Sequence, residues 1–216
     1  MKIKQYEKKK KIILSDLMEA RVYLGLSKSI WDPTIVSYLF GIRNGFCVFN
    51  LEHTLICLKK AIKVIYRVNH SNKQIIFVGF PDSEKSKLTK IYSNTDHLYI
   101  SNQSWINGIL TDGKDIKLYI HNFLTNLKLK KKKESDLFYE KFGGILNLKK
   151  KPSLIVIYDH SKNLDALKEA SKMGIPIISF VNSEGSTKQS DYPITGNFSS
   201  KLAGGLYKKI LKHSLN

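Results

Sequence analysis

The sequence predicts an α/β protein built on a parallel sheet. Three short apolar runs, at residues 75–78, 154–158 and 177–181, contain almost no polar side chain. Such continuous runs are typical of strands that are covered on both faces, whereas half-exposed strands alternate. Amphipathic helical patterns separate the runs along the chain. Strand–helix alternation of this kind predicts a three-layer sandwich with right-handed crossover connections.

The chain opens with a strongly basic segment. Residues 1–11 carry six lysines and one glutamate. A block of like charges repels itself and stays extended until a polyanion neutralises it. Only residues 12–14 could serve as an apolar region, so the segment does not resemble a signal peptide. We therefore expect residues 1–11 to form a basic N-terminal extension.

The first long helical pattern follows a weaker strand candidate at residues 46–49. A second weak strand candidate covers residues 97–100. One apolar stripe of the helix recurs at spacings of four and three residues, and it comprises Leu51, Leu55, Leu58, Ile62 and Ile65. Its basic residues, Lys59, Lys60, Lys63 and Arg67, occupy other faces. The pattern predicts an amphipathic helix with a basic outer side.

Two more helices are predicted in the C-terminal half. Ser161 is positioned to cap a helix that bears Leu164, Leu167 and Ala170, and Gly174 is positioned to end it. In the last helix, the predicted apolar stripe comprises Leu202, Leu206 and Ile210. The lysines predicted to lie outside this stripe are Lys201, Lys208, Lys209 and Lys212.

Residues 112–151 interrupt the strand–helix alternation. They contain no buried-strand pattern, only lysine-rich helical stretches around 116–129 and 137–148. Residues 126–151 alone carry nine lysines against three acids. We expect a lysine-rich helical arm at 112–151, inserted into an α/β domain made of residues 12–111 and 152–216.

The 216-residue chain has a large positive excess, with 36 basic residues against 18 acidic ones and a net charge of +18. Only Arg21, Arg43 and Arg67 are arginines, which leaves 33 lysines. Lysine neutralises phosphates as a point charge, whereas arginine favours bidentate reading of bases. The balance indicates a polyanionic partner bound with little sequence reading. Biased codon usage is the alternative source of many lysines.

The motifs that carry enzyme chemistry are missing. The sequence contains neither a G-x-G-x-x-G nor a G-x-x-x-x-G-K-[ST] phosphate loop. Its six histidines show no metal-ligand spacing, and Cys47 and Cys57 favour core positions over a metal or redox role. We expect no cofactor, no metal and no catalytic residue. An α/β nucleotide-using enzyme with Asp159 and His160 is an alternative, although a strand-end Asp159 that helps to cap the next helix and an exposed loop His160 are favoured.

The remaining alternatives concern aromatic side chains and membranes. Trp31 and Trp105 could stack on a nucleobase, but a packing role is favoured for such loop aromatics. The longest apolar runs span about five residues, so no stable membrane insertion is expected. A polybasic peripheral membrane module that uses residues 2–11 stays open.

Several fragments, in order, resemble the universal family of the second small-subunit ribosomal protein, in its bacterial and organellar form. They cover about three quarters of the chain. The similar fragments are Trp31-Asp32-Pro33, residues 38–45 running into residues 49–54 (together like the family's FGxRNGxxIINLEKT), Phe77-Val78-Gly79, residues 105–111 (like RWLGGMLTN), residues 152–159, Lys168-Glu169-Ala170, Gly174-Ile175-Pro176 and residues 192–197.

The resemblance implies a flavodoxin-like, that is Rossmann-like, sheet with a shortened helical hairpin inserted into it. It also implies a structural constituent of the small ribosomal subunit that acts in translation and is not an enzyme. Its implied partners are small-subunit ribosomal RNA, neighbouring small-subunit proteins and messenger RNA near its exit.

The chain departs from the family pattern at several positions. Tyr23-Leu24-Gly25-Leu26 stands where the family has HFGH, Gln103-Ser104 replaces a His-Arg pair, and Asn107 replaces a glycine. Together with the lysine bias and the trimmed arm, this drift favours a mitochondrial ribosome. The alternatives are another organellar ribosome or a bacterial cytoplasmic one.

Charge, the helix pattern and the resemblance together give the predicted RNA contacts. Arg43 and Asn44 form the best point contact, in the turn before residue 46. The full predicted set is Arg43, Asn44, Lys59, Lys63, Arg67, Trp105, Lys130, Lys131, Lys132, Lys133, Lys149 and Lys150.

Overall fold

The computed structural model describes residues 14–80, 97–101, 105–125, 138, 143, 145–146, 148 and 151–215. The chain divides into two compact units. The first comprises Met1–Arg67 and Ile178–Asn216, and the second comprises Val68–Ile177. The predicted extension at 1–11 lies outside the described residues, as does most of 126–150.

Five strands form one sheet: β4 (Ile75–Phe80), β5 (Leu98–Ser101), β6 (Leu154–Ile157), β7 (Ile177–Val181) and β8 (Tyr192–Thr195). The strand order is β5-β4-β6-β7-β8. Strand β4 pairs in parallel with β5 and β6, and β7 pairs in parallel with β8. Numbered along the chain, this order is 2-1-3-4-5, which is the flavodoxin-like order. The α/β class and its parallel sheet are therefore confirmed.

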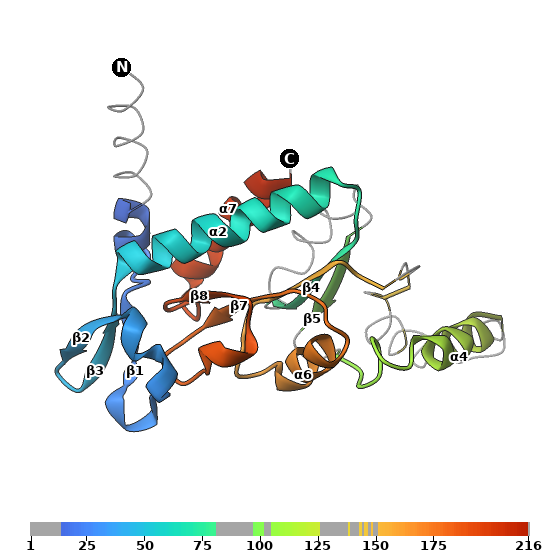
Figure 1. Cartoon of the computed structure of the whole chain (residues 1–216), viewed down its shortest axis with the longest axis horizontal. Helices are drawn as coiled ribbons and strands as arrows, with labels where there is room; N and C mark the ends of the chain where they lie inside the picture. The colour runs from blue at the N-terminus through green and yellow to red at the C-terminus, as the bar shows by residue number, and fades with distance from the viewer. Residues whose placement is uncertain are drawn as a thin grey trace, which may run out of the picture. The chain divides into compact units, whose positions relative to one another are not determined.

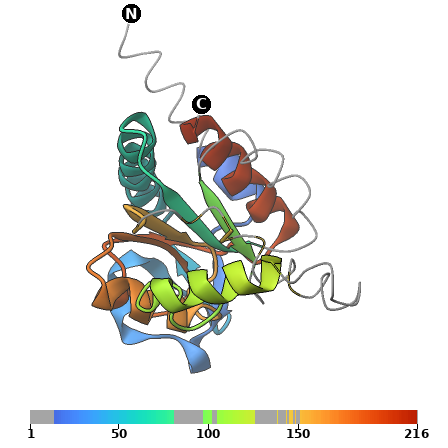
Figure 2. The same cartoon turned by 90° about the vertical axis from the view of Figure 1, so that its right-hand side faces the viewer.

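The second unit is organised around the fully buried strands β4 and β6. Residues Ile75 to Val78 and Leu154 to Ile157 are all 0% exposed. Helix α6 (Leu164–Lys172) contributes Leu167 and Ala170 to the same hydrophobic cluster. Helices α6 and α4 (Gly113–Thr125) lie on the same side of β4 and β5 in both views (Figures 1 and 2).

The described part of the predicted arm packs on this cluster. Its first predicted helix is present as α4. Ile120, Phe138 and Ile145 are buried with the apolar side chains of β4 and β5. The rings of Phe123 and Phe138 stack with centroids 3.8 Å apart. The second predicted helix, 137–148, falls largely outside the described residues.

Helix α6 begins two residues later than a Ser161 cap requires. Its N-cap residue is Asn163, whose side-chain Nδ2 donates to the Asp159 carbonyl oxygen at 2.7 Å. The chain first turns through residues 160–162, so the predicted Ser161 cap is wrong. The predicted end at Gly174 is confirmed. This glycine has φ +61°, and the Ile175 N–H donates to the Ala170 carbonyl oxygen at 3.0 Å.

The first unit contains a second, antiparallel sheet that the apolar runs did not predict in full. It consists of β1 (Leu24–Ser27), β2 (Leu39–Arg43) and β3 (Phe46–Phe49), in the order β1-β3-β2. Only β3 was anticipated, because β1 and β2 are short and carry mixed polar and apolar residues. Strand β8 was also missed, because Pro193 interrupts its apolar pattern.

Two 3-10 helices, η2 (Pro33–Tyr38) and η5 (Thr187–Gln189), close the loops of this unit. Asp32 caps η2 by accepting from the Thr34 N–H at 2.8 Å, and the Thr187 N–H donates to Thr34 Oγ1 at 3.1 Å. A third, η1 (Lys28–Ile30), follows β1. Trp31 packs against the small buried cluster of Ile35, Phe49 and Val181, so its predicted packing role is confirmed.

Helix α2 (Leu51–His70) has the predicted amphipathic form. Its buried residues are Thr54, Leu55, Leu58, Ala61 and Ile65, while Leu51 and Ile62 lie at the margin of the stripe. In Figure 1 it is the long teal helix. Lys60, Lys63 and Arg67 are exposed, as the spacing predicts, whereas Lys59 is half-buried.

The last helix, α7 (Lys201–Leu215), buries a different face from the one predicted. Ala203, Tyr207 and Leu211 are buried, whereas Leu202 is 66% exposed. The Tyr207 ring packs edge-on against Phe180 of β7, with centroids 4.8 Å apart. This large aromatic contact decides which face turns inward and carries Lys208 to 9% exposure. The prediction that Lys208 lies outside is therefore wrong.

Gly196, at the end of β8, lies where two backbone segments of the first unit, at residues 196 and 22, come close to each other. It has φ +148°, and a Cβ there would lie 2.7 Å from Val22 Cγ1. The next residue, Asn197, donates its N–H to the Val22 carbonyl oxygen at 2.8 Å. On the other side, Thr54 Oγ1 donates to the Thr195 carbonyl oxygen at 2.8 Å. A side chain at position 196 would force these contacts apart.

The substitution Gly196→Ala is expected to lower the free energy of unfolding by about 2 kcal/mol or more, because it adds both backbone strain and a clash. Gly205→Ala in α7 is the matched control, since a Cβ at Gly205 meets nothing within 4 Å. It should instead add about 0.5–1 kcal/mol through helix propensity. Urea unfolding of both variants checks this pair, and equal effects would contradict the described packing.

Candidate nucleic-acid interface

The β2–β3 hairpin presents the first predicted contact residues. Arg43 pairs directly with Phe46, so Asn44 and Gly45 form a two-residue turn. Both have positive φ, +49° and +78°, as a type I′ turn requires. Arg43 and Asn44 are exposed. The Lys28 N–H donates to the Gly45 carbonyl oxygen at 2.8 Å and fixes the tip.

Helix α2 presents the second group of predicted contacts, Lys59, Lys63 and Arg67. Lys63 and Arg67 are exposed, as is Lys60, which was not among the predicted contacts; spacings of three and four residues put these three on one face. Lys59 is half-buried beside them. The helix carries four basic residues and one acidic one, Glu52, which gives a net charge of +3. This arrangement suits neutralisation of several phosphates along one backbone.

Trp105 precedes a turn of the second unit. Its ring is partly buried against the hydrophobic cluster of that unit. Its Nε1 is buried and has no hydrogen-bond partner among the residues that the structure describes. A ring seated in this way has little free surface for a base, so packing is its evident role here.

A buried carboxylate holds the turn that follows Trp105. Glu169 of α6 is 9% exposed and accepts from the Gly108 N–H at 2.6 Å and from the Leu110 N–H at 3.2 Å. Gly108 has φ +95°, and its carbonyl oxygen accepts from the Asp112 N–H at 2.7 Å. Glu169 thus fixes the chain at the point where it enters α4.

The predicted contacts are distributed over different parts of the chain. Arg43, Asn44, Lys59, Lys63 and Arg67 belong to the first unit, and Trp105 belongs to the second. Lys130, Lys131, Lys132, Lys133, Lys149 and Lys150 lie outside the described residues, so their contacts stay a prediction.

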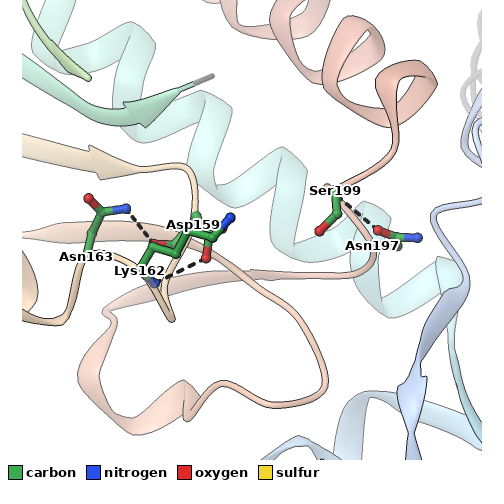
Figure 3. Close-up of polar contacts among 5 residues, drawn as sticks. All are labelled: Asp159, Lys162, Asn163, Asn197 and Ser199. Atoms are coloured by element: carbon green, nitrogen blue, oxygen red, sulfur yellow. Dashed lines mark hydrogen bonds and ion pairs between the residues drawn. The ribbon is translucent and has the colours of Figure 1, made fainter. Parts of the chain in front are cut away.

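The Asp159–His160 pair takes a structural role in the turn after β6. Asp159 Oδ1 accepts from the Lys162 N–H at 3.3 Å, and Oδ2 pairs with Lys162 Nζ at 3.1 Å (Figure 3). His160 is 2% exposed, so the expectation of an exposed loop histidine is wrong; the turn folds it inward. A similar local turn follows β8, where the Ser199 N–H donates to Asn197 Oδ1 at 2.9 Å (Figure 3).

The two cysteines, the candidate metal ligands and the helix lengths give no sign of another kind of site in the part of the chain that the structure describes. Cys47 is fully buried in β3, and burial raises the pKa of its thiol; burial likewise raises the pKa of the half-buried Cys57 thiol. Within the described ranges, no group of three His, Cys, Asp or Glu side chains could hold a metal ion. No helix in the same ranges is both long and apolar enough to cross a bilayer.

Comparison with known proteins decides the family. The model of the family described as Ribosomal protein S2 matches residues 17–216. The chain belongs to this family. It is 29% identical to the small ribosomal subunit protein uS2 of Ehrlichia chaffeensis, over 95% of this chain and 76% of that protein. Proteins of the same name from Hahella chejuensis (29% identical, 94% of this chain, 86% of that protein) and Treponema pallidum (26%, 94%, 75%) also match.

Family membership makes the chain a ribosomal protein and accounts for the resemblance seen in its motifs. The sequence predicted the Asn44-Gly45 turn, which is a strong two-residue turn signal between two apolar runs, but not the strand β2 that precedes it. It did not predict the role of Glu169, because the partners of this side chain are backbone groups about sixty residues away.

Replacing Glu169 with alanine is expected to cost about 2 kcal/mol or more, because it leaves two buried N–H groups without their acceptor. Amide exchange at Gly108 and Leu110 should accelerate. Lys168→Ala, one residue away and exposed, is the control and should change stability by about 0.5 kcal/mol or less. Hydrogen exchange followed by NMR, together with urea unfolding, provides the test. Unchanged protection of both amides in the alanine variant would show that the carboxylate does not hold the turn.

Proposed function

We propose that this chain, a structural protein of the small ribosomal subunit by its family, works there by neutralising phosphates of the subunit's RNA. The observation that carries the proposal is the basic face of α2, where three exposed cations recur along one side of a helix that is anchored by its other side. Neutralising a phosphate releases condensed counterions, so binding of this kind weakens as salt rises.

The hairpin tip supplies a second contact in the same unit. Arg43 and Asn44 are exposed on a turn whose geometry is fixed by two positive-φ residues. A rigid turn places its cation without a further loss of chain entropy. The lysine runs at 130–133 and 149–150 would extend the contact, as would the extension at 1–11. Neighbouring small-subunit proteins and messenger RNA near its exit are further proposed partners.

We also propose a mitochondrial ribosome as the location. Support comes from the drift of the family motifs at Tyr23–Leu26, Gln103-Ser104 and Asn107, together with the dominance of lysine. The relatives that match are bacterial, so a bacterial or another organellar ribosome is the alternative. Fractionation of the source cells decides between them: recovery of the protein in the mitochondrial matrix supports the proposal, and recovery with cytoplasmic ribosomes overturns it.

The phosphate-binding role is tested with a triple variant of α2. Lys60→Gln, Lys63→Gln and Arg67→Gln together should flatten the dependence of log affinity on log salt by about 2 to 3, because each phosphate contact contributes about 0.7 to 0.9. Binding of the full chain to purified small-subunit RNA, measured between low and moderate salt, provides the slope.

The matched control replaces three exposed lysines on other helices, Lys168, Lys172 and Lys209. Their replacement by glutamine removes the same charge. An equal loss of slope in both triple variants would mean that only net charge matters, which would remove α2 from the interface.

A further inference from the structure

One face of the β1-β3-β2 sheet is open. In an antiparallel sheet, directly paired residues point to the same face. Two rows of paired residues therefore make up this face, which we call the Phe46 face. They are Ser27, Phe46 and Arg43 in one row, and Leu24, Val48 and Gly41 in the other. Between them on β3, Cys47 points the other way and is fully buried, as is Phe49.

The shape of the Phe46 face leaves its central ring accessible. Phe46 is 52% exposed, although phenylalanine is usually an interior residue. Its row neighbour Ser27 is small. Gly41, diagonal to it, carries no side chain, and a Cβ built there meets nothing within 4 Å. The Phe46 ring therefore stands beside a small residue on β1, and the space at Gly41 of β2 is open.

The charges around this face are positive. Arg43 is the direct cross-strand neighbour of Phe46, and the exposed Lys28 is bonded through its backbone to the hairpin tip. Residues 33–51 contain no acidic side chain. The one acid between residues 21 and 51 is Asp32, which caps η2. The hairpin that carries Phe46 therefore contributes a cation and no acid to this face.

We propose that the Phe46 face binds an unpaired RNA base, which stacks on the Phe46 ring while Arg43 pairs with the adjoining phosphate. Unpaired bases are recognised in this way, by an aromatic platform with a cation beside it. The inference rests on the proposed RNA-binding function and adds a substrate class to it, namely single-stranded RNA rather than duplex.

The rigidity of the hairpin favours this occupant. The type I′ turn and the Lys28–Gly45 hydrogen bond fix the backbone positions of Phe46 and Arg43, which are directly paired across β3 and β2. A base and its own phosphate have a fixed separation, so a pre-set aromatic–cation pair matches them. An apolar protein segment is the other conceivable occupant, but the aliphatic share of the face is small, with Leu24 37% exposed and Val48 half-buried.

The test uses the full chain and two RNA probes: a labelled twelve-nucleotide oligoadenylate, and a fully paired RNA duplex of the same length. Phe46→Ala should weaken binding to the oligoadenylate by about tenfold, because stacking of one base is lost. Binding to the duplex should change less than about twofold, since a duplex offers no unpaired base. Leu202→Ala is the matched control, because Leu202 is also an exposed apolar residue, at 66%, and belongs to the same unit but lies on α7, outside the proposed RNA contacts.

A second pair of variants reports on contact directly. In Phe46→Trp the new indole should be quenched by the oligoadenylate, whereas in Leu202→Trp it should not. Both are compared with the parent, which contains Trp31 and Trp105. Matching thermal unfolding midpoints show that the variants fold.

Three results would overturn the inference. Unchanged affinity of Phe46→Ala for the oligoadenylate would remove the ring from RNA contact. Unchanged affinity combined with poor incorporation into small subunits would assign the face to a neighbouring protein instead. Failure of the parent itself to bind either RNA would refute the proposed function, and the stacking site with it.

Discussion

Strands β4, β6 and β7 are apolar except for Ser179, and the need to cover both of their faces decides how the rest of the chain is used. Ile155, Phe77 and Phe180 are all 0% exposed. Covering such strands takes amphipathic helices, since a helix can turn one stripe inward and leave the other outside. Helix α6 does this for β4 and β6 in the second unit, and α2 turns its own apolar stripe inward in the first. Lys60 and Lys63 of α2 and Lys168 and Lys172 of α6 remain exposed. The interior residues pack against one another, so the residues available for binding lie on the outer helix faces, in the turns and on the small second sheet.

The outer surface cannot neutralise itself. With 36 basic residues against 18 acidic ones, the chain carries eighteen more positive charges than negative ones. Some of the acids are also committed to local structure, as Glu169 and Asp159 are. A polyanion that accepts this excess gains affinity from counterion release and needs no deep pocket. A structural ribosomal protein fits this description better than an enzyme, because it uses extended surfaces and rigid turns.

Much of the fold was predictable because local patterns specify it. Continuous apolar runs located β4, β6 and β7, and the stripe of α2 follows from its spacing. Prediction failed where a distant contact overrides the local pattern. The face of α7 is chosen by the packing of Tyr207 on Phe180, which no local spacing reveals. His160 is turned inward by a loop, and the start of α6 at Asn163 depends on a turn that begins at Asp159.

The interface was predictable only in part, for the same reason. Arg43, Lys63 and Arg67 are exposed cations that composition and helical spacing can find. The open surface around Phe46 requires knowledge of which residues pair across β1, β3 and β2, and that register involves bulges on either side of β3. The hold of Glu169 on Gly108 and Leu110 likewise joins segments that are remote in sequence.

Sedimentation of the tagged full-length chain from extracts of its source cells tests the central claim most directly. The account predicts that the protein travels with the small ribosomal subunit through a sucrose gradient and moves to the top after ribonuclease treatment. A protein that stays at the top of the gradient in untreated extract, free of ribosomal particles, would contradict it.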